Sequence, residues 1–149
     1  MTNASTAPRA GVEQPSKALN VALWIVQLLL ALTFVGTGLW KLSTPIVELA
    51  QLMPWMGQVL PNFLYLTAAA DLAVGLGILL PSLLRIEPGL TVLAAYGGVG
   101  LMGCATAFHL FRGEPESTPF NLLLLALALF VAWGRGSKLP IEPREKASP

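Results

Sequence analysis

Charged residues are scarce in this sequence. Only 11% of its 149 residues are charged, against 54% hydrophobic residues, and the mean hydropathy is +0.67. A soluble domain usually carries about 25% charged residues, so the composition argues against a soluble protein. Nine Lys and Arg nearly balance eight Asp and Glu. Proteins that bind nucleic acid usually carry an excess of basic residues in a stripe. This sequence has no such excess, so we expect no nucleic-acid partner.

Cysteine and histidine occur once each, as Cys104 and His109. One cysteine cannot form an intramolecular disulfide, a CxxC redox pair or a cysteine-based zinc site, which excludes membrane thiol oxidoreductases. One histidine excludes a bis-histidine haem and most transition-metal clusters. We therefore expect no metal site and no redox cofactor held by this chain alone. The residues do not decide whether the protein is an enzyme.

Four apolar blocks alternate with short polar segments. They predict membrane-spanning helices at about residues 21–41, 62–80, 88–111 and 119–135. The first block runs for 20 residues without a charge, long enough at about 1.5 Å per residue to cross a hydrocarbon core of about 30 Å. No small-x-small cleavage site follows it before Lys41, so we interpret it as a signal anchor. The predicted fold class is all-α, an integral membrane four-helix bundle.

Most Lys and Arg residues lie on the side of the membrane that holds both termini. Seven are on that side and two on the other; the seven are Arg9, Lys17, Arg85, Arg135, Lys138, Arg144 and Lys146, and the two are Lys41 and Arg112. The positive-inside rule then predicts a multi-pass protein of the plasma (inner) membrane with both termini in the cytoplasm.

The composition also divides the chain. Residues 1–19 are rich in Ala, Thr, Pro and Ser, and residues 136–149 mix charges with prolines. Neither segment can bury a core, so we expect two flexible cytoplasmic tails on either side of a membrane domain at 20–135.

Two further patterns concern packing. Small residues recur at every fourth position, which predicts close contacts between helices in lipid. They are Ala69, Ala73 and Gly77, then Ala94 and Gly98, and then Gly103 and Ala107. In the first outer loop, apolar residues repeat at helical spacing over 46–53, with Glu48 on the other face. We expect a short amphipathic helix in the membrane interface there, either as a simple cover for the bundle or as a lid over an outward-facing pocket.

Asp71 lies nine residues into the second block, about 13 Å from its outer end. A carboxylate near the bilayer midplane costs about 2.5–3.5 kcal/mol on insertion scales, so we expect it to face the bundle interior. Two roles remain open for it: a structural acid that is protonated and hydrogen-bonded, or a group that binds a ligand or handles protons.

Lys41 and His109 are the candidate partners of Asp71, near the outer ends of the first and third helices. Each has a simpler interpretation as an ordinary interfacial residue. Because lysine tends to extend toward water, we expect a water or a ligand between Lys41 and Asp71 rather than a direct salt bridge. With Tyr65 and Asn121 as further lining residues, these side chains predict an outward-opening polar pocket.

The segment Phe34–Leu42 (FVGTGLWKL) resembles the first-helix signature of DoxX-like membrane proteins, in which an aromatic residue and glycines precede a Lys-Leu pair. Asp71 with the Gly- and Leu-rich run after it is similar to the acidic motif of their second helix. Met102, Ala105 and His109 are similar to a series late in their third helix. The resemblance covers about residues 21–135.

This resemblance implies a four-helix membrane fold but no single reaction. Family members have been linked to quinone-coupled sulfur oxidation, to redox-stress complexes and, in animal relatives, to receptor assembly. The family more often has Glu where this chain has Asp71, which shortens the reach of the acid toward Lys41.

Three classes of function fit these residues. We prefer an accessory or redox-linked membrane subunit in which Lys41, Asp71 and His109 surround a quinone headgroup or a small anion, while a membrane or redox partner protein supplies electrons. In that class Lys41 is the electrostatic anchor, His109 a hydrogen-bond donor or proton shuttle and Asp71 the proton acceptor. The alternatives are a proton-coupled small transporter that uses Asp71 and needs to form a homodimer, and a membrane assembly factor or chaperone.

Overall fold

Each apolar block forms a long helix. The computed structural model describes residues 16–144, and its four long helices are α1 (Lys17–Ser43), α3 (Pro61–Leu84), α4 (Gly89–Phe111) and α5 (Thr118–Trp133). The short elements are α2 (Ile46–Leu52), the 3₁₀ turns η1 (Pro54–Gly57) and η2 (Pro115–Ser117), and η3 (Gly134–Lys138), a π-helical turn that continues α5. The prediction of an all-α bundle with four membrane-spanning helices and a short extra helix is confirmed.

The helix ends differ from the prediction in two places. The α1 helix begins earlier than expected because the side chain of Ser16 accepts a hydrogen bond from the Leu19 N–H at 3.3 Å and caps it. The α3 helix continues through Pro81, where we expected it to stop. The hydroxyl of the buried Ser82 lies 2.8 Å from that of Thr91 on α4. This contact between two helices stabilises the last turn of α3 and offsets the loss of a helix hydrogen bond at Pro81. The left-handed backbone of Arg85, with φ of 56°, then ends the helix.

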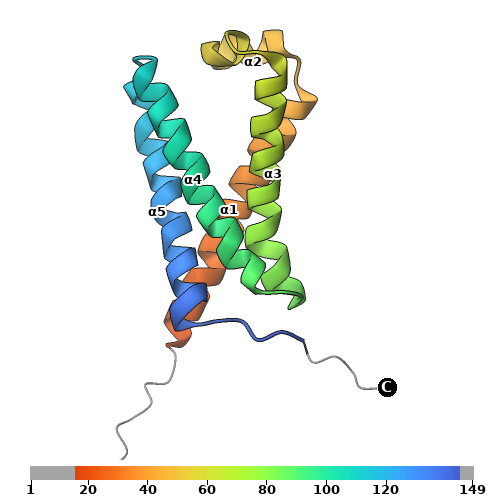
Figure 1. The fold of residues 1–149 in the computed structure, drawn as a ribbon, viewed down its shortest axis with the longest axis vertical. Coiled ribbons are helices and arrows are strands. Elements are labelled where there is room, and N and C mark those ends of the chain that lie inside the picture. Colours follow the sequence, from red (N-terminus) through yellow and green to blue (C-terminus); the bar gives the residue numbers. More distant parts are fainter. Residues whose placement is uncertain (1–15, 145–149) are drawn as a thin grey trace, which may run out of the picture.

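Parts of both predicted tails, residues 1–15 and 145–149, lie outside the described residues. Residues 17–19 belong to α1, and residues 136–138 belong to η3. The chain after η3 runs beneath the bundle (Figure 1), and the Arg144 N–H donates to the Arg85 carbonyl at 2.9 Å.

The four long helices form two pairs, α1 with α3 and α4 with α5 (Figure 1). We call the end that carries α2 the α2 end, and the end where α1 begins and α5 finishes the terminal end. The two pairs meet at the terminal end and diverge toward the α2 end. The α1 helix crosses between them, because it starts beside the end of α5 and finishes beside α3.

Small residues set where the helices touch. A Cβ on Gly77 of α3 would lie 2.7 Å from that of Ala94 on α4, which confirms the predicted seam between these helices near the terminal end. Farther along α4, a Cβ on Gly100 or Gly103 would meet nothing within 4 Å, so the prediction of a close contact at Gly103 is wrong. Between α1 and α3, a Cβ on Gly75 would lie 3.1 Å from the Ala31 carbonyl oxygen, so only glycine permits this approach of the two backbones.

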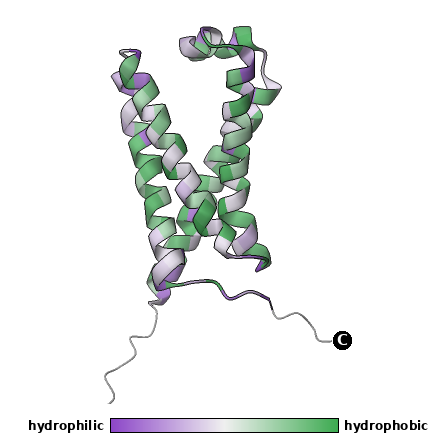
Figure 2. Cartoon of the chain, in the orientation of Figure 1, coloured by the Kyte–Doolittle hydropathy of each residue, from purple (hydrophilic) through white to green (hydrophobic). Residues whose placement is uncertain are grey.

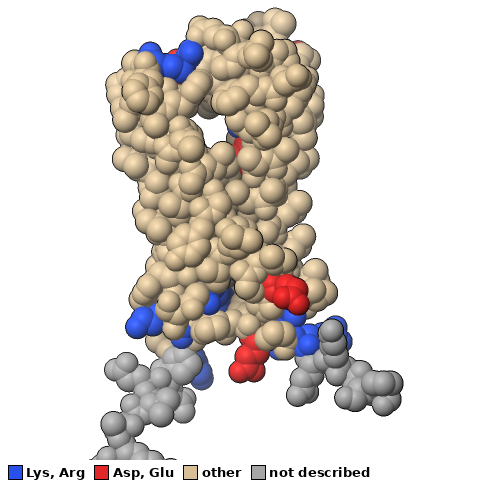
Figure 3. All heavy atoms as spheres, viewed as in Figure 1, with Lys and Arg blue, Asp and Glu red and all other residues tan. Residues whose placement is uncertain are grey.

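The outer surface of the helices is apolar, as a lipid environment requires. Large side chains such as Leu32, Leu66 and Leu93 are more than 60% exposed to the surroundings of the bundle. Hydrophobic residues cover the long helices (Figure 2), whereas most charged atoms gather at the two ends (Figure 3). All four long helices have the length and hydropathy to span a membrane, and the chain is a multi-pass membrane protein.

We predict that Gly75→Ala lowers stability by about 1–3 kcal/mol, because the new methyl group forces α1 away from α3. Gly100→Ala is the matched control on α4, and it should be neutral or stabilising by up to about 1 kcal/mol, since alanine favours the helix and meets no neighbour. Thermal unfolding of the two variants in the same detergent checks the difference. Equal unfolding temperatures would show that the α1–α3 seam is loose.

Candidate functional site

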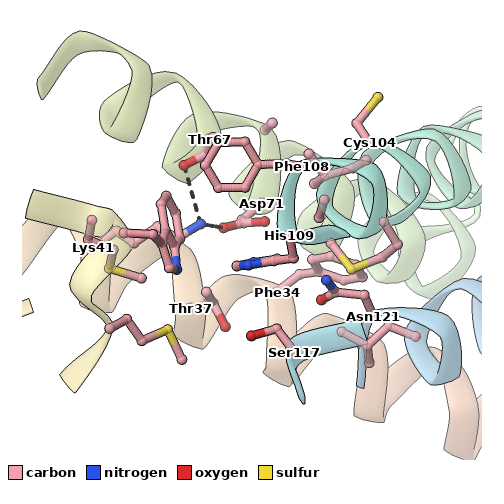
Figure 4. Close-up of a pocket in the computed structure, with 18 of the residues that line it drawn as sticks. Phe34, Thr37, Lys41, Thr67, Asp71, Cys104, Phe108, His109, Ser117 and Asn121 are labelled. Carbon is pink, nitrogen blue, oxygen red and sulfur yellow. Dashed lines mark hydrogen bonds and ion pairs between the residues drawn. The ribbon is translucent and has the colours of Figure 1, made fainter. Parts of the chain in front are cut away.

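A cavity of about 620 Å³ lies between the two helix pairs near the α2 end (Figure 4). Its walls are mostly apolar and come from α1, η1, α3, α4 and α5; they include Phe34, Met56, Leu101, Met102, Phe108 and Leu124. A small number of polar side chains converge on it, among them Thr37, Thr67, Lys41, Asp71, His109 and Asn121. An apolar pocket with few convergent polar groups is the usual form of a small-molecule site.

Lys41 and Asp71 form a direct ion pair on one wall of this cavity. The Nζ of Lys41 lies 2.8 Å from Oδ2 of Asp71 and donates to Oγ1 of Thr67 at 3.3 Å. Both charged residues are buried, at 7% and 3% exposed. Our expectation of a water or ligand between them is wrong, because Gly38 brings α1 against the Ala68 carbonyl oxygen of α3 and leaves no room for one. Asp71 faces the interior and Lys41 points inward to meet it.

Met53 and the η1 turn cover the α2 end of the cavity, and the α2 helix packs beside them. Leu49 of α2 and Met56 of η1 are buried against Leu64 of α3, which anchors this cover to the bundle. Trp55 of η1 points to the polar groups: its ring centroid lies 5.8 Å from the Lys41 Nζ and 5.8 Å, edge to face, from the His109 ring. The predicted helix at 46–53 is observed as Ile46–Leu52; its depth in the interface stays a prediction.

His109 lies at the end of α4 and is 8% exposed. Its Nδ1 is 2.8 Å from Oε2 of Glu114, and the same carboxylate accepts from Nε of Arg112 at 3.0 Å. The Nη2 of Arg112 also donates to Oε1 of Gln58, just after η1. This chain of contacts, which we call the clasp (Gln58, Arg112, Glu114 and His109), joins the α4–α5 loop to the covering segment.

The clasp depends on the charge of Glu114. Hydrogen bonds from Arg112, and then from His109, hold the pKa of this carboxyl below its usual value of 4.5. Its contribution is therefore complete above the ordinary pKa and is lost as the pH falls through the lowered pKa. Neither Gln58 nor Glu114 is among the predicted site residues, because loop positions carry no periodic signal in the sequence.

Of the two further lining residues that the sequence predicts, Asn121 lies at the cavity and Tyr65 does not. Asn121 of α5 lines the cavity, is 9% exposed, and its Nδ2 has no hydrogen-bond partner among residues 16–144. Tyr65 is 46% exposed and is not a lining residue. The structure thus brings together Lys41, Asp71, His109 and Asn121, but not Tyr65. Six residues, about one and two-thirds turns, separate Tyr65 from Asp71 on α3 and place it on a different face of the helix.

The cavity opens sideways, between the two helix pairs. Leu66 of α3 and Phe120 of α5 line it, yet they are 65% and 57% exposed, and Cys104 of α4 is an exposed lining residue too. Figure 3 shows the opening near the α2 end, with charged atoms visible inside it. These lining residues belong to membrane-spanning helices, so the opening faces lipid.

Comparison with known proteins identifies a family. The model of the DoxX-like family matches residues 25–131, which include Lys41, Asp71, His109 and Asn121. No curated protein and no solved structure matches the chain.

We predict that Lys41→Met lowers stability by about 3 kcal/mol or more, because Asp71 then keeps a buried charge without a partner. The double variant Lys41→Met/Asp71→Leu should recover most of that loss, since it removes both charges from an apolar site. Thermal unfolding measures both, and Lys138→Met, at an exposed lysine of η3, is the control. A single variant as stable as the wild type would mean that the ion pair contributes nothing to the fold.

Proposed function

This chain belongs to the DoxX-like family, and we propose that it is an accessory or redox-linked membrane subunit whose cavity binds a quinone. The supporting observation is the unpartnered Nδ2 of Asn121, which is buried at a largely apolar cavity. A buried donor without an acceptor costs about 1–3 kcal/mol, and a ligand carbonyl oxygen in the cavity would remove that cost.

The arrangement of donors suits a ring with carbonyl groups on opposite sides. Lys41 stands on the α1 wall, whereas His109 and Asn121 stand on the α4–α5 wall. The Nδ1 of His109 donates to the Glu114 carboxylate, so its Nε2 remains for a ligand and is a donor when the imidazole is protonated. The aromatic and methionine side chains between the two walls would pack against the ring.

A neutral ligand is favoured over a small anion. The charge of Lys41 is already balanced by Asp71 at 2.8 Å, so the cavity offers little net positive charge to an anion. The sideways opening onto lipid also favours a membrane-soluble molecule, whose tail can remain in the bilayer while its headgroup enters the cavity.

Reduction of a quinone to a quinol takes up two electrons and two protons. A partner protein would supply the electrons. The contact between His109 and the part-exposed Glu114 supplies a link from the cavity toward the surface, which supports His109 as a proton shuttle. In the reverse reaction, quinol oxidation with the partner protein as electron acceptor, two protons are released, and Asp71 would accept one of them on the other wall.

The two alternatives have less support. A proton-coupled transporter would need a path through the whole bundle, and the two helix pairs meet at the terminal end (Figure 1). An assembly factor would need no unpartnered buried donor on a residue that lines an apolar cavity, which leaves Asn121 unexplained.

We predict that Asn121→Leu weakens the binding of decylubiquinone about 10-fold, the effect of losing one hydrogen bond in a dry site. Leucine keeps the size of the side chain and removes the donor. Because Trp40 and Trp55 line the cavity, quenching of tryptophan fluorescence by added decylubiquinone measures the binding.

The matched control is Asn62→Leu, an exposed position at the start of α3, which should bind like the wild type. Quenching that rises linearly without saturation, or the same midpoint for Asn121→Leu and the wild type, would contradict a quinone site in this cavity.

We also propose that both termini lie in the cytoplasm and the protein in the plasma membrane, from the distribution of Lys and Arg. A Glu116→Cys substitution in a Cys104→Ser background should then react with a membrane-impermeant maleimide added outside intact cells. Reaction only after the reagent is given access to the cytoplasm would mean that Glu116 lies inside and both termini lie outside.

A further inference from the structure

A second polar centre lies at the terminal end of the bundle, around Arg135 of η3. This residue is 5% exposed. Its Nε donates to Oε1 of Gln27 at 2.8 Å, and its Nη1 donates to Oδ1 of Asn20 at 2.8 Å and to the Leu139 carbonyl at 3.4 Å. The guanidinium carbon also lies 4.9 Å from the ring centroid of Trp24. All of these partners are neutral.

The charge of Arg135 therefore has no counter-charge in the described part of the chain. None of the three ion pairs found among residues 16–144 includes it. Its Nη2 is buried and has no hydrogen-bond partner there either. A buried charge without a partner of opposite sign is strongly unfavourable, so this arrangement indicates an anion that is supplied from outside these residues.

A cavity of about 410 Å³ adjoins Arg135. The end of α3, the start of α4 and the segment from η3 to Ile141 form its walls; the lining residues are Ser82, Pro88, Gly89, Val92, Arg135, Gly136, Pro140 and Ile141. No acidic side chain is among them. The acids next to the lining residues Pro88 and Ile141 in the sequence, Glu87 and Glu142, are exposed and do not line the cavity.

The other polar groups of this cavity are also donors. It contains the first residue of α4, Gly89, whose helix has no side-chain cap. A Cβ on Gly89 would meet nothing within 4 Å, so a ligand can approach this helix N-terminus closely. Ser82 lines the cavity and shares one hydrogen bond with Thr91. When Thr91 donates this bond, the hydroxyl of Ser82 keeps its own proton for a ligand.

We propose that this terminal-end cavity binds a phosphate-class anion through Arg135, with the α4 N-terminus and the Ser82 hydroxyl as further donors. A planar guanidinium together with a helix N-terminus suits a phosphate group. The same chemistry is offered by the headgroup of an anionic lipid and by free phosphate. This site is separate from the quinone cavity, and its test does not depend on quinone binding.

The test is the thermal unfolding of the purified, delipidated chain with two probes. Inorganic phosphate is added in detergent, against sodium chloride of equal ionic strength. In a second arm, nanodiscs of phosphatidylcholine alone are compared with nanodiscs that also contain phosphatidylglycerol. We expect at least one probe to raise the unfolding temperature by about 5 °C. A response to phosphate in detergent identifies the free anion as sufficient, and a response to phosphatidylglycerol alone identifies the lipid.

Variants assign the response to this cavity. Arg135→Gln should abolish it, whereas Lys138→Gln, which removes an equal charge from an exposed residue of the same turn, should keep it. Because Arg135→Gln also alters the contacts to Gln27 and Asn20, Gly89→Leu is the second variant: it fills the cavity, leaves those contacts intact, and should fold but not respond. The proposal is overturned if the wild type responds to neither probe, or if Gly89→Leu or Arg135→Gln responds as the wild type does.

Discussion

The ion pair between Lys41 and Asp71 is the contact on which the α2 end of the bundle depends. In lipid, two apolar helices gain little by touching, so a buried charge pair at 2.8 Å fixes the position of α1 relative to α3 more firmly than leucine contacts can. The pair requires close backbones, which Gly38 and Gly75 permit. It also places one wall of the cavity, because Thr67 and Trp55 are arranged around the lysine. Separation of α1 from α3 would expose two charges to hydrocarbon at once.

The α1 helix carries a polar anchor at each end of the bundle, and this explains the splayed shape. Near the terminal end, Gln27 donates to the Ile78 carbonyl of α3 and accepts from Arg135 after α5, so one α1 side chain joins both helix pairs. Near the α2 end, Lys41 bonds to α3 alone. The helices of the two pairs are thus bonded directly at the terminal end, where the seam of Gly77 with Ala94 adds a close contact. At the α2 end the pairs are joined through the clasp and the covering segment, and the cavity lies in the space between the helices that this arrangement leaves.

The sequence predicted the features that depend on local patterns and missed those that depend on distances between helices. Unbroken apolar blocks predicted the four helices, and the cost of a midplane carboxylate predicted that Asp71 faces inward. The direct bond to Lys41 depends on how closely α1 approaches α3, which no local pattern contains. The prediction for Tyr65 is wrong because its depth along α3 suits the cavity but the face of the helix on which it lies does not. Arg135 counted as a surface cation in the charge balance, yet the turn of η3 buries it beside Gln27.

The sideways opening has a consequence for how this cavity can discriminate between ligands. A ligand that leaves lipid for an apolar pocket gains little hydrophobic free energy, because both surroundings are equally apolar. Lipid chains can also occupy such a space, so any ligand competes with them. Selectivity must then come from directed hydrogen bonds, which acyl chains cannot accept. Asn121 and His109 lie where they can supply these bonds, and the Lys41–Asp71 pair excludes apolar chains from its own wall. The few polar side chains of the cavity therefore determine its selectivity, and the many apolar ones determine only its shape.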